Sequence, residues 1–388
     1  MKLKHEFFKL PLSFDIERLQ AEILQLTEQD WHAHHEGFKG NIAVPLLSVG
    51  GQVNNDFKGP IEQTQALSKL PYIQQILASF NEVFGRSRLM ALEPGCEVPI
   101  HTDINYHWYK RVRIHIPIIT TDNVIFHCGD KQVNMAAGEC WIFDSWKPHK
   151  VVNGSDIRRI HLVIDTMGSS KFWQMVDNSQ VPGIQATTLS TKHLEFDPEN
   201  KPNILMERFN APVVMTPGEL ESLISDLKTE INNNPANKAD GIISFSQIID
   251  NFAQDWRRLW SLYGVNEQGW PQYHQLRDRT FQLARNFDNK LQLINGGSAL
   301  QMLIHCIIDP ALSPEVAKLT TASVDSVITK PVSDKPVTAK PLTTAQGSEN
   351  NLGQRGSSKA KASAVPVSRN SPCSCGSEKK YKQCCGAL

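Results

Sequence analysis

The residues with the clearest chemical potential are a histidine and an aspartate two positions apart, in the stretch HTDINYHWYKRVRIHIPI at residues 101–118. Side chains at this spacing leave an extended segment from the same face, so His101 and Asp103 can hold one ion together. We expect a third ligand from His149, which follows a proline in FDSWKPHKVV. Two histidines and one carboxylate are the donor set of the facial triad of non-haem iron(II) sites, which leaves coordination positions open. A lone His-x-Asp is common, so the hypothesis of an iron site depends on the residues that accompany it.

Two predicted strands near these residues carry charge along one face. In RVRIHIPI, alternation places Arg111, Arg113 and His115 opposite apolar residues. In RRIHLVID, the same alternation places Arg159 and His161 together. One interpretation is that the charged faces meet solvent while the apolar faces pack on helices. We favour the other, in which they line a barrel lumen, because unpaired guanidinium groups there are costly unless an anion such as a dicarboxylate cosubstrate fills the space.

The elements that must position these residues are mainly short strands. From Arg88 onward, alternating or apolar runs are separated by Pro-Gly, Gly-Asp, Ala-Gly and Asn-Gly turns. This pattern predicts a barrel or jelly roll rather than a parallel sheet. A helix over SFDIERLQAEILQL, with Ser13 as its N-cap, is expected before the strands. We assign residues 1–182 to this barrel domain, which makes the class α+β.

The chain beyond the barrel is predicted to have three further parts. Residues 183–312 carry helical signals, among them TPGELESLISDLKTEI, where Thr216 and Glu219 have the spacing of a capping box. Two roles fit this helical domain: covering the barrel mouth or forming a homodimer. Residues 313–370 are rich in Thr, Ser, Ala, Lys and Pro, a composition typical of a flexible linker. The last part, 371–388, contains a cluster of cysteines.

Composition argues against several classes of protein. Lys and Arg number 40 and so do Asp and Glu, so the net charge favours neither nucleic acid nor a membrane surface. No stretch approaches the roughly 18 consecutive apolar residues of a membrane span. The first residues also lack the apolar core of a signal peptide. We therefore expect a cytoplasmic protein with no membrane and no specific nucleic-acid partner.

Four motifs taken together resemble a known family. EPGCEVPIHTD, RVRIHIPI, GECWIFDSWKPHKVVNGS and RRIHLVID, between about residues 88 and 165, are similar in order and spacing to the aspartyl/asparaginyl β-hydroxylase family of iron(II)/2-oxoglutarate dioxygenases, which includes bacterial proline hydroxylase relatives. The resemblance implies a double-stranded β-helix, the barrel of cupins and jelly rolls. It also implies that His101, Asp103 and His149 hold iron(II).

The same resemblance implies roles for residues on the charged strand faces. Arg159, ten residues beyond the second histidine ligand, would bind the far carboxylate of 2-oxoglutarate, and Arg113 and His115 would be a second cosubstrate-contacting pair. This chain departs from the family at two positions. It keeps Asp103, which animal members lack, and Met90 stands where the family has a serine that contacts the cosubstrate.

The activity implied is hydroxylation of an amino acid, or of an amino-acid side chain in a peptide or protein, coupled to formation of succinate and CO2 from 2-oxoglutarate. Two alternatives stay open. One is a cupin-type metal enzyme without oxygen chemistry. The other is a non-catalytic adaptor that binds partners through the helical domain and the C-terminal cysteine cluster.

The cysteine cluster predicts a second metal site. SPCSCGSEKKYKQCCGAL has four thiols that can close tetrahedrally around zinc, and so short a segment would fold only on binding the ion. The proposed ligands are Cys373, Cys375, Cys384 and Cys385. This segment also resembles the SEC-C motif. That resemblance implies zinc binding and contact with a partner protein or the ribosome.

Overall fold

The computed structural model describes residues 1–34 and 37–317 of the 388-residue chain. The predicted zinc knuckle and nearly all of the predicted linker lie outside the described residues. Within the described part, no helix combines the length and the apolar character needed to cross a membrane.

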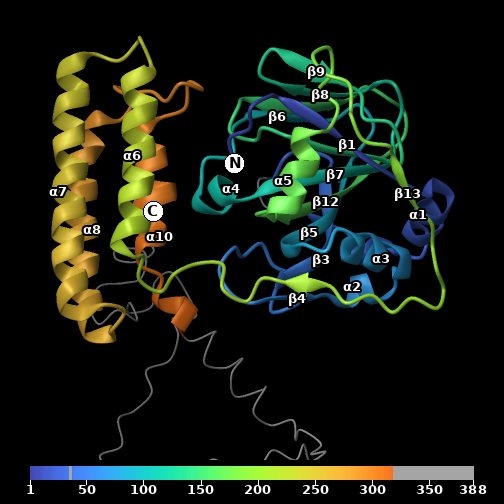
Figure 1. Ribbon diagram of the computed structural model, residues 1–388, viewed down its shortest axis with the longest axis horizontal. Coiled ribbons are helices and arrows are strands. Elements are labelled where there is room, and N and C mark those ends of the chain that lie inside the picture. Colours follow the sequence, from blue (N-terminus) through green and yellow to red (C-terminus); the bar gives the residue numbers. More distant parts are fainter. Residues whose placement is uncertain (35–36, 318–388) are drawn as a thin grey trace, which may run out of the picture.

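The barrel is built from two sheets whose central strands are antiparallel (Figure 1). The centre of the larger sheet has the strand order β10 (Glu139–Phe143), β7 (Val112–Ile119), β12 (Arg159–Thr166) and β5 (Val83–Leu92). The smaller sheet has the order β6 (Glu97–His101), β11 (His149–Asn153), β8 (Val124–Cys128) and β9 (Lys131–Val133). Apart from the β8–β9 hairpin, consecutive strands from β5 to β12 alternate between the sheets. This is the predicted double-stranded β-helix, so the fold class is confirmed.

Further strands widen the larger sheet to ten. They are β1 (Phe7–Phe14), β2 (His32–Ala33), β3 (Asn41–Val49), β4 (Ile61–Gln63), β13 (Lys192–Leu194) and β14 (Leu205–Met206). β13 pairs with β1 and β14 with β5, both in parallel. The segment after residue 182, predicted as part of the helical domain, therefore adds two strands to the barrel sheet.

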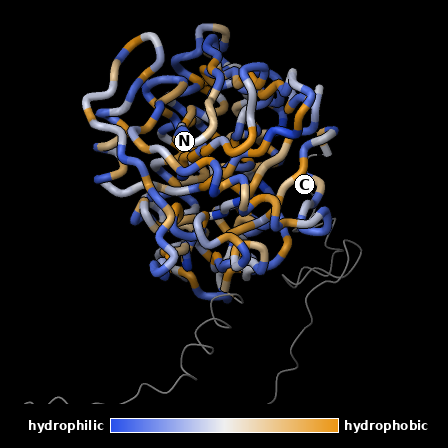
Figure 2. Tube along the Cα trace, turned by 90° about the vertical axis from the view of Figure 1, so that its right-hand side faces the viewer, coloured by the Kyte–Doolittle hydropathy of each residue, from blue (hydrophilic) through white to orange (hydrophobic). Residues whose placement is uncertain are grey.

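The two faces of the larger sheet have different partners. On its outer face, Ile114, Ile116 and Leu162 join a buried cluster with residues of α1 (Ile16–Ile23) and α3 (Pro71–Ser79). Two further short helices, α2 (Gln65–Ser68) and α5 (Ser170–Asp177), also lie in the barrel region. Figure 2 shows hydrophobic segments, in orange, running through the middle of the molecule. The apolar strand faces therefore pack on helices, which leaves the charged faces to the barrel interior.

The predicted N-cap of α1 is wrong. Ser13 belongs to β1, where it pairs with Glu139. The side chain of Asp15 caps the helix instead, accepting a hydrogen bond from the Arg18 N–H at 2.9 Å. Strand pairing thus extends β1 past the expected cap, so the helix begins later than predicted.

The helices after residue 216 form a second core beside the barrel (Figure 1). They are α6 (Pro217–Asn233), α7 (Ala239–Tyr263), α8 (Trp270–Ala284), α9 (Ala299–Met302), the π-helix η4 (Leu303–Ile308) and α10 (Asp309–Ala311). Two barrel side chains, Tyr106 and Trp146, are buried in this helical core. The helical region is therefore packed against the barrel through residues that lie close in sequence to the predicted metal ligands.

Glu219 joins the two regions. Its N–H donates to the Thr216 hydroxyl, as expected for a helix cap. Its carboxylate does not return to the helix end, so the second half of the predicted capping box is wrong. It instead accepts a hydrogen bond from the Tyr106 hydroxyl at 2.6 Å and pairs with Lys110, both on α4 (Tyr106–Lys110). A residue that could cap its own helix is thus used to bind the helix that follows the first two predicted metal ligands.

The charge of Arg111 is paired with a carboxylate of the protein itself. It is 1% exposed and forms a two-pronged ion pair with Glu207, with its Nε and one terminal nitrogen 2.7 and 2.8 Å from the two carboxylate oxygens. Glu207 follows β14, and its own N–H donates to the Phe84 carbonyl of β5. The buried pair therefore holds this segment against the barrel, and Arg111 does not need an external anion.

We predict that Arg111→Met lowers the free energy of unfolding by about 3–5 kcal/mol, because it leaves the Glu207 carboxylate buried without its partner. Urea denaturation followed by circular dichroism measures this difference. The control is Arg257→Met, which removes an exposed pair with Glu221 and should cost less than about 1 kcal/mol. Equal effects of the two substitutions would contradict this account of Arg111.

Candidate metal centre

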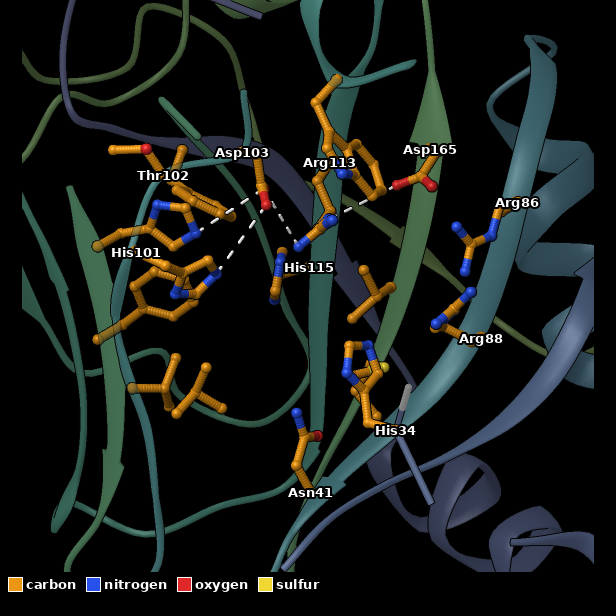
Figure 3. A pocket seen from close by; sticks show the side chains of 18 of the residues that line it. His34, Asn41, Arg86, Arg88, His101, Thr102, Asp103, Arg113, His115 and Asp165 are labelled. Carbon is orange, nitrogen blue, oxygen red and sulfur yellow. Dashed lines mark ion pairs between the residues drawn. The ribbon is translucent and has the colours of Figure 1, made fainter. Parts of the chain in front are cut away.

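Pairing of two strands brings the predicted metal ligands together. His101 ends β6 and His149 begins β11, and the two are register partners in the smaller sheet. Asp103 lies two residues beyond His101, and its N–H donates to the Ser145 carbonyl at 3.0 Å, which fixes the turn. One ligand atom from each of the three side chains lies within 4.8 Å of the others. Segments more than forty residues apart thus converge on one point (Figure 3).

Both histidines are oriented for metal binding. The Nδ1 atom of His101 lies 2.8 Å from the Pro99 carbonyl, and that of His149 lies 2.9 Å from the Lys147 carbonyl. A carbonyl accepts only from a protonated nitrogen, so each Nε2 carries the lone pair and faces Asp103, at 3.9 Å and 3.8 Å. The His149 Nε2 and Asp103 Oδ2 atoms are buried and have no hydrogen-bond partner. Two buried atoms with lone pairs and no hydrogen-bond partner are suitable ligands for a divalent metal ion.

The electrostatic environment keeps the ligands in metal-binding protonation states. Burial opposes ionisation of Asp103, but Arg113, 3.6 Å from its Oδ2, holds the pKa of the carboxyl below its usual value. Burial lowers the pKa of His149 to about 4, so its imidazole is neutral at neutral pH. A carboxylate and a neutral imidazole are the forms that bind metal.

Arg159 is a buried cation without a carboxylate partner among the described residues. It is 4% exposed and lines the cavity beside the triad. Its closest polar contact is the His161 Nδ1, at 2.7 Å, while its Nε has no hydrogen-bond partner. Burial lowers its pKa to about 9, which still leaves a positive charge at neutral pH. An uncompensated guanidinium of this kind is expected to bind an anion.

Arg113 and His115 also face the cavity. The Arg113 guanidinium stacks 3.8 Å above the Trp108 ring and lies between Asp103 and Asp165. His115 is 5% exposed, and neither ring nitrogen has a hydrogen-bond partner. Burial lowers its pKa well below the usual value, so the ring is neutral. Both residues are therefore on the wall where the sequence placed them, whereas Arg111, on the same strand face, pairs with Glu207.

The cavity extends from the triad to a wall that the sequence analysis did not assign. It has a volume of about 230 Å³. Its far wall includes Arg86, Arg88 and Asp165 (Figure 3), and Phe57 also lines the cavity. The two arginines alternate with Ser87 in RSRLMAL on β5, so the same two-residue periodicity that indicated the other charged faces was present here.

Asp165 is a second buried carboxylate in this cavity. Its Oδ2 lies 3.2 Å from the His107 Nε2 and its Oδ1 lies 3.7 Å from the Arg113 Nε. Burial raises its pKa to about 7 despite the surrounding arginines. The aspartate ends the motif RRIHLVID, but alternation alone could not indicate a role because its partners come from helix α4 and strand β7.

The chain matches two family models. Residues 15–168 match the aspartyl/asparaginyl β-hydroxylase family, and residues 369–387 match the SEC-C motif. Both resemblances inferred from the sequence motifs are therefore confirmed. The first match contains all of the candidate iron and cosubstrate residues and supports a hydroxylase type of function for the barrel.

Solved structures similar to this chain include a 2OG-Fe(II) oxygenase family oxidoreductase from Burkholderia pseudomallei, with 12% identity over 39% of this chain and 78% of that one, at a TM-score of 0.30. A Pseudomonas putida prolyl-4-hydroxylase has 14% identity over 42% and 92% of the chains, at 0.29. A Trichoplax adhaerens prolyl hydroxylase, in complex with a hypoxia inducible factor peptide fragment, has 11% identity over 46% and 89%, at 0.31.

We predict that His101→Ala and Asp103→Ala each weaken binding of iron(II) or cobalt(II) by at least roughly 10–100-fold, because each removes a direct ligand whose partners alone cannot complete the site. Anaerobic titration followed by visible absorption measures the affinity. His127→Ala, on neighbouring strand β8 but outside the cluster, is the matched control and should bind metal like the wild type. Unchanged affinity in both ligand variants would place the metal elsewhere.

Proposed function

We propose that the protein is an iron(II)- and 2-oxoglutarate-dependent dioxygenase that hydroxylates an amino acid or an amino-acid side chain of a peptide or protein. The observation that carries this proposal is the combination of two features in one cavity. His101, Asp103 and His149 converge on a common point, and Arg159 lies in the same cavity as a buried cation without a carboxylate partner. The family match over residues 15–168 supports the same function.

Two groups of residues would bind the metal ion and the cosubstrate. His101, Asp103 and His149 would hold iron(II), which when bound supplies the oxygen activation that couples 2-oxoglutarate decarboxylation to hydroxylation. Arg159 would anchor the far carboxylate of 2-oxoglutarate, and His115, neutral and close by, would contact the same molecule. Both groups are preorganised by burial, so little reorganisation is needed when the cosubstrate enters.

Arg113 has a supporting role in this scheme. Its guanidinium lies 3.6 Å from Asp103 and keeps that ligand ionised before metal enters. Stacking on Trp108 restricts the arginine to this position. Aromatic residues Phe126 and Phe143 line the cavity and contact the rings of His115 and His149, so this side of the cavity is apolar.

We also propose that the C-terminal segment binds zinc through Cys373, Cys375, Cys384 and Cys385 and recruits a partner protein or the ribosome. The SEC-C match at residues 369–387 supports this role. These residues lie outside those the structure describes. The cytoplasmic location and the homodimer also remain predictions from the sequence.

The oxygenase activity is tested by succinate formation from 2-oxoglutarate in the presence of iron(II) and oxygen. We predict that Arg159→Met raises the KM for 2-oxoglutarate by roughly 10–100-fold, the loss expected for one charge-assisted contact. The adjacent Arg158 points to the opposite face and pairs with Glu28 and Glu93, so Arg158→Met is a matched control that should stay within about threefold of wild type.

Three outcomes separate the candidate functions. Oxygen-dependent succinate formation that is sensitive to Arg159→Met supports the dioxygenase. A protein that binds metal but is indifferent to Arg159→Met would be a metal enzyme without oxygen chemistry. Absence of both metal binding and turnover would favour the non-catalytic adaptor.

A further inference from the structure

We propose that His161 is a positioning residue for Arg159 and holds that guanidinium in the orientation that binds the far carboxylate of 2-oxoglutarate. This inference rests on the proposed dioxygenase function and deepens it. It assigns a role to a buried histidine that neither the metal site nor the cosubstrate site uses. The observation that carries it is the hydrogen bond between the two side chains, which lie on one face of β12.

This hydrogen bond fixes the tautomer of His161 and restricts the rotation of Arg159. A terminal nitrogen of Arg159 lies 2.7 Å from the His161 Nδ1. A guanidinium can only donate, so Nδ1 accepts and the ring proton is on Nε2. Both side chains are buried. The guanidinium cannot turn away without leaving a buried N–H unpaired, which is costly. The bond therefore holds Arg159 in one orientation before the cosubstrate binds.

His161 supports Arg159 from outside the cavity. Arg159 lines the cavity beside the triad, whereas His161 is not among the described residues that line it. The His161 ring instead packs against the ring of His115, with the centroids 5.8 Å apart and the planes at 79°. His161 is therefore placed to act through Arg159 rather than on the cosubstrate itself.

Packing alone does not explain a histidine at this position. The Nε2 N–H of His161 is buried and has no hydrogen-bond partner, which costs stability. The residues opposite His161 on the two adjacent strands, Met90 and Pro117, are apolar, so an apolar side chain would suit these surroundings without that cost. The bond that Nδ1 accepts from Arg159 is the interaction that an apolar residue could not supply.

The neutrality of His161 leaves the charge of Arg159 available to an anion. Burial, followed by the charge of Arg159, lowers the pKa of His161 well below its usual value, so the ring is neutral at neutral pH. A neutral acceptor orients the guanidinium without cancelling its charge. Arg111 shows the opposite arrangement, because the carboxylate of Glu207 both orients that guanidinium and pairs with its charge. Histidine at position 161 thus keeps Arg159 both oriented and charged.

Three substitutions at position 161 separate the acceptor, its charge and the packing of the ring. His161→Phe keeps an aromatic ring but removes the acceptor. His161→Asn is smaller but keeps a neutral acceptor, because its Oδ1 takes the covalent position of the histidine Nδ1. His161→Asp has the shape of His161→Asn and adds a negative charge. Arg158→Met, on the opposite face of the strand, is the matched control.

Two measurements are made on each protein. Calorimetry without oxygen gives the Kd for 2-oxoglutarate of the iron(II)-loaded protein, where no turnover competes with binding. Succinate formation in the presence of oxygen gives the KM and kcat. Melting temperatures without ligand report folding, and His161→Phe should be at least as stable as wild type because it removes an unpaired buried N–H.

We expect His161→Phe to raise the Kd and the KM for 2-oxoglutarate by roughly 3–10-fold, because the freed arginine must then be immobilised on binding. The kcat at saturation should stay within about twofold, since the reacting atoms are untouched. His161→Asn should restore binding to within about twofold of wild type, because it keeps a neutral acceptor. His161→Asp should weaken binding by at least about tenfold, because its carboxylate competes with the cosubstrate for Arg159.

The inference is overturned if His161→Phe binds 2-oxoglutarate as tightly as wild type, or if His161→Asn and His161→Asp bind it equally well. A role in packing alone predicts that pattern, since phenylalanine keeps the ring and the other two side chains have the same size. If His161→Asp does not fold, the order of His161→Phe and His161→Asn decides the question.

Failure of the proposed function looks different. Wild-type protein that forms no succinate, but shows the expected order of Kd values among the variants, would lose the dioxygenase function while the role of His161 stands. Wild-type protein that does not bind 2-oxoglutarate at all would overturn both.

Discussion

The pairing of β6 with β11 is the constraint on which the site depends. It places His101 directly opposite His149, and the hydrogen bonds to the Pro99 and Lys147 carbonyls then turn both imidazoles toward Asp103. A slip of one residue in this register would send one histidine to the outer face of the sheet. The double-stranded β-helix secures the register because the next strands along the chain, β7 and β12, are locked into the larger sheet. The convergence of the three candidate ligands is thus a consequence of barrel closure.

The barrel domain contains several buried or half-buried guanidinium groups. The protein satisfies Arg111 with a dedicated carboxylate and shares Arg113 between Asp103 and Asp165. It gives Arg159 no acidic partner, and Arg86 has only an aromatic face. This division separates arginines that maintain the fold from arginines held in an unfavourable state. Sites with such stored electrostatic cost are where proteins bind and transform ligands.

Alternation along the strands was enough to predict the barrel and the charged faces of β7 and β12, which carry Arg113, His115 and Arg159 into the cavity. It failed where a partner came from a distant segment. The role of Arg111 depends on Glu207, whose segment follows a two-residue strand that leaves little periodic signal. Ser13 had the chemistry of a helix cap, but β1 continues through it. Arg86 and Arg88 carried the same alternating signal as Arg111 and Arg113, yet only the closed barrel shows that their face points toward the triad.

The burial of Tyr106 and Trp146 in the helical core has a consequence for where the catalytic unit ends. Tyr106 lies three residues after Asp103 and Trp146 three residues before His149, so both ligand-bearing loops are packed from outside by helices α6 to α10. Asn295 reinforces this contact through a hydrogen bond to the Trp146 carbonyl at 2.5 Å. The family match ends at residue 168, but a barrel cut there would expose two large aromatic rings and free both loops. The part of the chain that keeps both loops packed therefore extends beyond the barrel and includes the helices.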